Sequence, residues 1–145
     1  MKTIVKHLAV GLSALILMAG SPPVDDKTKV IKALKSFVEA ADRQDPDQLS
    51  QILDANFRAV VNRAFGSEEV SIMDKITYLD LIKQKKIGGD KREVSIIRVD
   101  ITGNNACVHS VLKGSHLIFN TFTDLIRDSN GNWYVINDMP HIDKV

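Results

Sequence analysis

The chain of 145 residues contains a single cysteine, Cys107, so no internal disulfide bond can form. A hydrophobic core must hold the fold, and a chain of this length with 44% apolar residues can bury one. An excess of positive charge is also missing, since 19 Lys and Arg stand against 18 Asp and Glu. This balance argues against nucleic acid as a partner, because neutralising phosphates requires a basic surface.

Motifs for metals, phosphates and nucleophilic catalysis are missing as well. The four histidines, at positions 7, 109, 116 and 141, lack the spacing of a metal site. No glycine-rich phosphate loop follows a predicted strand, and no serine lies in a nucleophile-elbow pattern. The sequence therefore predicts no metal and no cofactor.

The longest uncharged stretch lies at the N-terminus. Lys2 and Lys6 precede a run without charges from Leu8 to Ala19, and small residues follow it. This pattern is typical of a secretory signal peptide over residues 1–20. The run is shorter than the roughly 20 residues of a membrane-spanning helix, so no stable membrane anchor is expected. We expect a single domain over residues 25–145 that is exported to the periplasm or secreted.

Apolar spacing predicts three helices. The first begins at Asp25 or Asp26 and repeats apolar residues every three or four positions up to Ala41. A short second helix follows the pair Asp45-Pro46 and forms a hairpin with the first. For the third helix, Thr77 and Asp80 have the spacing of a capping box.

The remaining residues predict strands. Residues 57–64 and 70–76 flank a Gly66-Ser67 turn, and residues 92–102, 105–113, 116–128 and 132–139 are separated by three glycine-containing dipeptides. This order predicts an α+β fold, in which a curved antiparallel sheet wraps around the helical hairpin and the third helix.

Two segments resemble a known family. The third helix reads Thr77-Tyr78-Leu79-Asp80-Leu81-Ile82, and the last strands read Phe122-Thr123-Asp124-Leu125-Ile126 and Gly131-Asn132-Trp133-Tyr134-Val135-Ile136-Asn137. Over residues 28 to 140 the chain resembles the putative lumazine-binding proteins of the nuclear-transport-factor-2-like superfamily, which have the cystatin-like cone fold. That superfamily also holds the ketosteroid isomerases and polyketide cyclases. The resemblance implies a cone with a pocket, often in a dimer.

Two-residue turns would fix the register of the last four strands. They pair Thr102 with Asn105, Lys113 with His116, and Ser129 with Asn132. One face is then mainly apolar and should face the helices, with Ile97 and Tyr134 on it and Val94, Ile96 and Trp133 on the other. A pocket for a small apolar or aromatic molecule is predicted between that face and the helices, lined by Leu34, Phe37, Phe57, Tyr78, Ser110, Thr121, Thr123 and Tyr134.

The other face carries a polar row of Arg98, His109, Asn120 and His141, and Asp124 lies opposite Asn137 in the same register. Two interpretations stay open for this row. It could perform acid–base work or hold an anion. Alternatively it is the convex outer face of the sheet, which is solvated or contacts a second subunit in a homodimer.

Three functions follow from these patterns: binding of a small ligand in the cone, an enzyme like the ketosteroid isomerases or polyketide cyclases, or a dimeric interaction module. Carbon-acid chemistry needs a carboxylate or histidine over the substrate and a donor for the oxyanion. The apolar face contains no such pair. The sequence therefore favours binding and predicts no catalytic residue.

Overall fold

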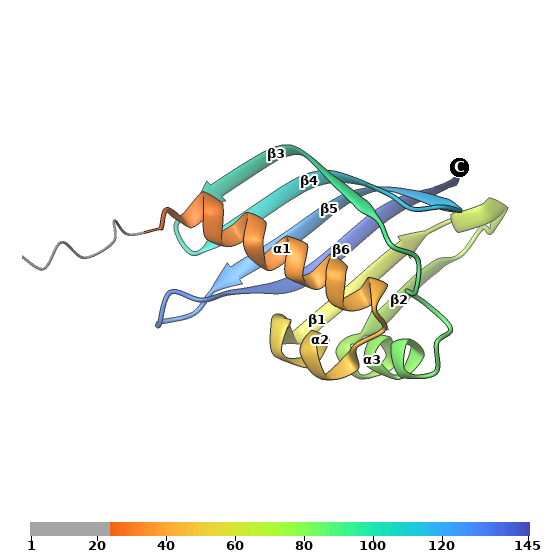
Figure 1. The fold of residues 1–145 in the computed structure, drawn as a ribbon, viewed down its shortest axis with the longest axis horizontal. Helices are drawn as coiled ribbons and strands as arrows, with labels where there is room; N and C mark the ends of the chain where they lie inside the picture. Colours follow the sequence, from red (N-terminus) through yellow and green to blue (C-terminus); the bar gives the residue numbers. More distant parts are fainter. Residues whose placement is uncertain (1–23) are drawn as a thin grey trace, which may run out of the picture.

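The computed structural model describes residues 24–145, which form one α+β unit (Figure 1). Its elements are α1 (Asp26–Asp42), α2 (Pro46–Ile52), β1 (Leu53–Asn62), the 3-10 turn η1 (Ala64–Gly66), β2 (Val70–Asp74), α3 (Lys75–Lys83), β3 (Glu93–Thr102), β4 (Asn105–Lys113), β5 (Leu117–Arg127) and β6 (Trp133–Lys144). The signal peptide predicted over residues 1–20 lies outside the described residues and stays a prediction. No helix within residues 24–145 is long and apolar enough to cross a membrane.

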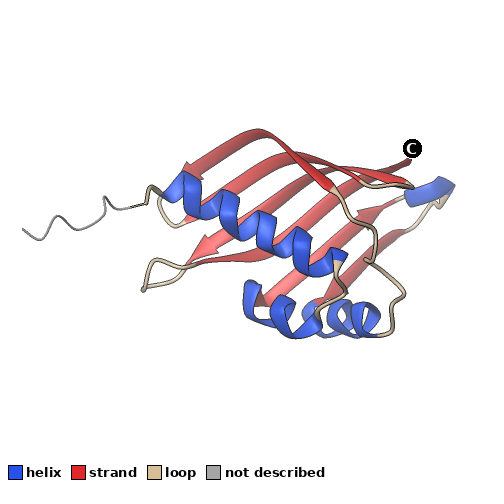
Figure 2. Ribbon diagram, viewed as in Figure 1, coloured by secondary structure: helices blue, strands red, loops and turns tan. Residues whose placement is uncertain are grey.

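The six strands form one curved sheet in the order β2-β1-β6-β5-β4-β3, and the three helices lie on its concave side (Figure 2). All neighbouring strands are antiparallel except β1 and β6, which run parallel. The expected wholly antiparallel sheet is therefore wrong at this one pairing. A parallel neighbour needs a long connection, and α3 and the four strands between β1 and β6 supply it.

Each helix begins at an aspartate that accepts a hydrogen bond from its first turn. Asp25 caps α1, and Asp45, followed by Pro46, caps α2, as the sequence predicts. For α3 the cap is Asp74, whose Oδ1 accepts from the backbone N–H of Thr77 at 2.8 Å. The capping box predicted at Thr77 and Asp80 is therefore wrong, because the helix begins three residues earlier.

The register agrees with the prediction at one turn and differs at two. Thr102 pairs with Asn105 as expected. Lys113 pairs with Ile118 instead of His116, so the register shifts by two residues and every side chain keeps its face. Next to the last turn the pairing of β5 with β6 is shifted by one residue, so that Arg127 pairs with Trp133. An irregularity between Asp124 and Leu125 restores the predicted pairing, and from Asp124 with Asn137 onward the strands pair as expected.

The one-residue shift moves the start of β6 to the opposite face from the one predicted. Trp133 and Val135 point toward the helices, with 7% and 0% of their surface exposed, whereas Tyr134 turns to the convex side. A bulge between Ile96 and Arg98 has the same effect on the start of β3. Ile97 is 58% exposed, and Val94 and Ile96 pack against the core. These face assignments were wrong because bulges leave no clear mark in the sequence.

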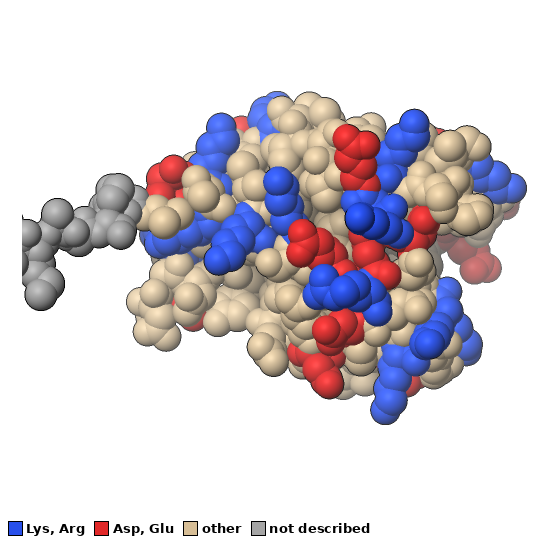
Figure 3. Space-filling view, viewed as in Figure 1, with Lys and Arg blue, Asp and Glu red and all other residues tan. Residues whose placement is uncertain are grey.

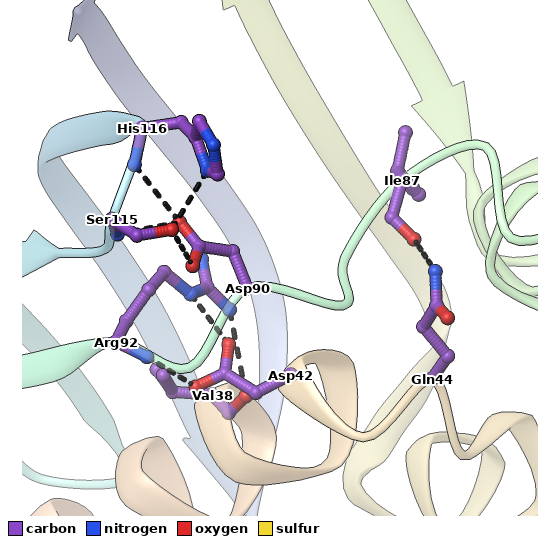
Figure 4. A network of polar contacts seen from close by, with 8 residues as sticks. All are labelled: Val38, Asp42, Gln44, Ile87, Asp90, Arg92, Ser115 and His116. Atoms are coloured by element: carbon purple, nitrogen blue, oxygen red, sulfur yellow. Dashed lines mark hydrogen bonds and ion pairs between the residues drawn. The ribbon is translucent and has the colours of Figure 1, made fainter.

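The segment of residues 84–92, called the strap below, ties α1 to the β4–β5 turn (Figure 4). The Asp90 carboxylate accepts from the backbone N–H of Ser115 at 2.8 Å and from its Oγ at 2.7 Å. A Cβ on Gly114 would lie 2.1 Å from Asp90 Oδ2, so a side chain there would displace the Asp90 carboxylate. At the helix end, Gln44 Nε2 donates to the Ile87 carbonyl at 3.0 Å. The strap thereby closes one end of the cone.

Candidate functional site

Asp138 on β6 brings a carboxylate onto the concave side of the sheet. It pairs with Thr123 on β5 and with Ala59 on β1, both of which are buried on that side. The Oγ1 atoms of Thr121 and Thr123 donate to Asp138 Oδ1 at 2.8 and 2.9 Å. Both donors reach the same oxygen, so Oδ2 has no hydrogen-bond partner among residues 24–145. This oxygen can accept a hydrogen bond from a ligand.

Burial makes the charged form of Asp138 less favourable than it is in water. Burial raises the pKa of this carboxyl above the ordinary aspartate value, and the hydroxyls of Thr121 and Thr123 and the charge of Arg92 offset only part of that effect. A carboxylate whose pKa is raised holds a proton more readily than a solvated one. Such groups suit both polar ligand recognition and proton transfer.

Tyr78 on α3 is the second polar group of this region. Its ring packs edge-on against Phe57, with 5.2 Å between the ring centroids. Burial and the nearby charge of Asp138 raise the pKa of Tyr78, so the phenol stays protonated. Its Oη makes no hydrogen bond to the described part of the chain, and this oxygen is not fully buried. Tyr78 can therefore donate to a ligand or to water.

Several apolar side chains around these two residues keep partial exposure. Tyr78, Phe119, Val94, Ile96 and Met73 all pack against the core but keep partial exposure. In contrast, the core farther along the sheet is fully enclosed. We call the group of Tyr78, Arg92, Phe119, Thr121, Thr123 and Asp138 the concave site.

Arg92, the last residue of the strap, forms one edge of the concave site. Its Nε donates to Asp42 Oδ1 at 2.6 Å, and its guanidinium lies 5.1 Å from the centroid of the Phe119 ring. The same residue and Val94 line a groove of about 580 Å³ between α1 and the start of β3. The groove and the concave site thus share one wall.

The structure places the predicted pocket residues as follows. Leu34, Phe37 and Phe57 belong to the enclosed core, with exposures of 3% or less. Ser110, Thr121 and Thr123 are fully buried on the concave side. Tyr134 is on the convex side, where its Oη donates to Asp128 Oδ2 at 3.4 Å, so its place in the pocket was wrong for the register reason given above.

The predicted polar row lies on the convex side, and its register needs correction. Arg98 faces His109, but His109 faces Phe122, because the β4–β5 turn is longer than two residues. The His109 and Phe122 rings stack at 4.6 Å. Asn120 lies diagonally across and still contacts His109, at 2.7 Å between Oδ1 and Nε2.

The other members of that row are bound to local partners. Asp124 faces Asn137 as predicted, and the Asn137 amide donates to it at 3.1 Å. His141 faces Asn120 and lies 3.4 Å from Asp143. Within residues 24–145, no three His, Cys, Asp or Glu side chains are placed to hold a metal ion. None of these polar residues contributes to the concave site.

Sequence reasoning missed Asp138 and Arg92. The expectation of an apolar face without ionisable groups is wrong. The predicted register of the last two strands already pairs Asp138 with Thr123, so the sequence alone could have placed Asp138 on this face. Arg92 carried no such signal, because its role depends on Asp42, which lies 50 residues earlier in the chain.

Comparison with known proteins identifies the family and the fold. The sequence model of the family described as putative lumazine-binding matches residues 25–141. An NTF2-like protein of unknown function from Silicibacter pomeroyi is 16% identical, with a TM-score of 0.69 over 81% of this chain and 95% of its own. A second one, from Shewanella baltica, is 16% identical, with a TM-score of 0.70 over 86% and 98%.

The CaMKII hub from S. rosetta is also similar, at 13% identity and a TM-score of 0.66 over 84% of this chain and 100% of the hub. No curated protein sequence matches this chain. At such low identities the structural likeness shows the fold alone. The predicted α+β cone of the nuclear-transport-factor-2-like type is confirmed.

The raised pKa of Asp138 predicts how stability depends on pH. The folded state holds this proton more tightly than the unfolded state, so stability falls as the pH rises from the ordinary aspartate value through the raised one. Asp138→Asn removes the charge, so we expect this variant to be more stable relative to the unmodified protein at pH 7.5 than at pH 4. Urea unfolding at both values measures this difference. Thr121→Val removes one donor to the carboxylate and should make the total fall in stability larger. An equal effect of Asp138→Asn at both pH values contradicts the assignment.

Proposed function

Since the chain belongs to the putative lumazine-binding family and has the nuclear-transport-factor-2-like fold, we propose that its concave site binds a small, planar, largely apolar molecule. The observation that carries this proposal is the Asp138 carboxylate on the concave side, with Oδ2 left without a partner among the described residues. Such a site favours a ring compound that bears a hydrogen-bond donor.

Apolar contacts provide affinity for the ligand, and polar contacts provide selectivity. The partly exposed rings of Phe119 and Tyr78 offer surface against which a planar ligand can lose water. Asp138 then selects among such ligands, because a hydrogen bond to a charged group contributes about 1.5–3 kcal/mol. Tyr78 Oη supplies a second contact on the same side. The expected ligand is therefore aromatic and carries at least one N–H or O–H group.

Two naphthalenes test this proposal. We expect 2-naphthol, which has a hydroxyl donor, to bind roughly tenfold more tightly than 2-methoxynaphthalene, which has none. In Asp138→Asn the threonine hydroxyls hold the amide oxygen and the NH2 group faces the ligand, so this preference should disappear. Isothermal titration calorimetry measures all four affinities.

A convex-side variant, Phe122→Ser, provides the matched control and should leave both affinities unchanged. Absence of binding by either naphthalene contradicts a ligand site on the concave side. A preference for 2-naphthol that survives in Asp138→Asn contradicts the role of the carboxylate.

Proton transfer is the second candidate function. The sequence-based objection to an enzyme was the lack of an inward-facing base and donor, and Asp138 with Tyr78 removes that objection. Asp138 would take a proton from carbon, and the Tyr78 hydroxyl would donate to the oxyanion that develops.

The base-promoted ring opening of 5-nitrobenzisoxazole tests this chemistry without knowledge of the natural substrate. The base removes the ring proton from carbon, the N–O bond breaks, and a coloured nitrile phenolate forms. We expect turnover that rises with pH through the raised pKa of Asp138 and falls about a hundredfold or more in Asp138→Asn. Equal rates for the two proteins exclude Asp138 as a general base.

We also propose a homodimer formed through the convex side of the sheet. An apolar stripe crosses that side, with Ile72 at 65%, Met139 at 44% and Phe122 at 41% exposure. Ile72 faces Val60 and Met139 faces Phe122, so the stripe runs across several strands. Exposed apolar patches of this kind mark interaction sites. Trp133, expected within this surface, is instead buried in its own fold.

Sedimentation equilibrium tests the homodimer. We expect the unmodified protein to sediment as a dimer and Phe122→Asp to shift the equilibrium to monomer, since a carboxylate would be buried without a partner. Phe65→Asp is the matched control, because Phe65 is 61% exposed in η1, outside the stripe, and its variant should remain dimeric. A monomer at all concentrations contradicts the proposal.

A further inference from the structure

The groove between α1 and the start of β3 carries more positive than negative charge. Figure 3 shows cationic and acidic side chains lying close together over this part of the molecule. Apart from Val94 the groove is lined only by charged residues: the cationic Lys35, Arg43, Lys91 and Arg92 and the acidic Glu39 and Asp42. An anion is therefore the kind of group that its charge favours.

The local pairing leaves the two lysines of the groove without an acidic partner. Asp42 is neutralised by Arg92 in a pair whose side chains are 9% and 12% exposed. Arg43 donates to the neutral Gln48. Among residues 24–145, neither Lys35 nor Lys91 forms an ion pair, and both are exposed at the groove. An anion can thus reach two lysines without breaking an existing ion pair.

The groove borders the concave site at two residues. Val94 lines the groove and also packs against the core from the concave side. Arg92 lines the groove and lies over the Phe119 ring. The groove and the concave site are therefore neighbours, with Arg92 between them.

We infer that this groove is an anion subsite of the concave site, and that the ligand class is a planar ring compound with a hydrogen-bond donor at one end and a carboxylate at the other. The donor binds Asp138, and the carboxylate lies between Lys35 and Lys91. This inference rests on the ligand site proposed above. The open groove leaves the carboxylate partly hydrated, so the attraction costs little desolvation and is screened by salt.

The test extends the naphthalene series by one compound. 6-Hydroxy-2-naphthoate adds a carboxylate to 2-naphthol at the opposite end of the ring system. At low ionic strength we expect the acid to bind roughly tenfold more tightly than 2-naphthol, about threefold for each lysine. Lys35→Gln and Lys91→Gln should each remove about threefold of this gain, and Glu39→Gln should add a similar factor. None of the three should change the affinity for 2-naphthol.

Lys32→Gln is the matched control, because Lys32 is exposed on α1 but does not line the groove. It should leave the preference for the acid intact. An equal loss in Lys32→Gln, or a preference that survives in the Lys35→Gln/Lys91→Gln double variant, overturns the inference. Tight binding of 2-naphthol with no gain for the acid overturns the anion subsite alone, whereas failure of both compounds to bind overturns the ligand site itself.

Discussion

The ion pair between Arg92 and Asp42 is the interaction on which the concave site depends. Asp42 ends α1 and Arg92 precedes β3, and the carboxylate accepts from both the side chain and the backbone N–H of Arg92. Both charges are nearly enclosed, and an enclosed charge is tolerated only with a partner. The pair therefore fixes the distance between the helix and the edge of the sheet. Because the same guanidinium lies on Phe119 and acts on Asp138, it also sets the field inside the cone.

A second polar group is held inside the cone by hydroxyls alone. Asp138 lies between strands whose inward side chains are otherwise mostly apolar, and only Thr121 and Thr123 donate to it. A hydroxyl offers weaker compensation for burial than a cation does, which explains why the pKa of Asp138 stays raised although Arg92 acts in the opposite direction. The site is thus arranged around a carboxylate that is held in place but not neutralised.

Much of the fold could be predicted from the sequence, because local chemistry determines it. Asp25 and Asp45 with Pro46 mark two helix starts, and the Gly103-Asn104 turn fixes the pairing of β3 with β4. The site could be predicted only in part. Two irregularities, at Ile97 and near Leu125, depend on how the sheet curves over the helices and have no local signature. The position of Asp138 could be predicted from the alternation of side chains along β6. The role of Arg92 could not, because it depends on a contact with Asp42 at the end of a distant helix.

The β4–β5 turn has a consequence for how sequences in this family can be aligned. It is two residues longer than the tightest hairpin, yet Ser110, Thr121 and Thr123 still face inward, because side chains alternate with a period of two. Each one-residue shift elsewhere in the sheet coincides with an irregularity. Between β4 and β5, insertions in relatives should therefore come in pairs, and an odd gap there signals either a compensating bulge or a misaligned strand.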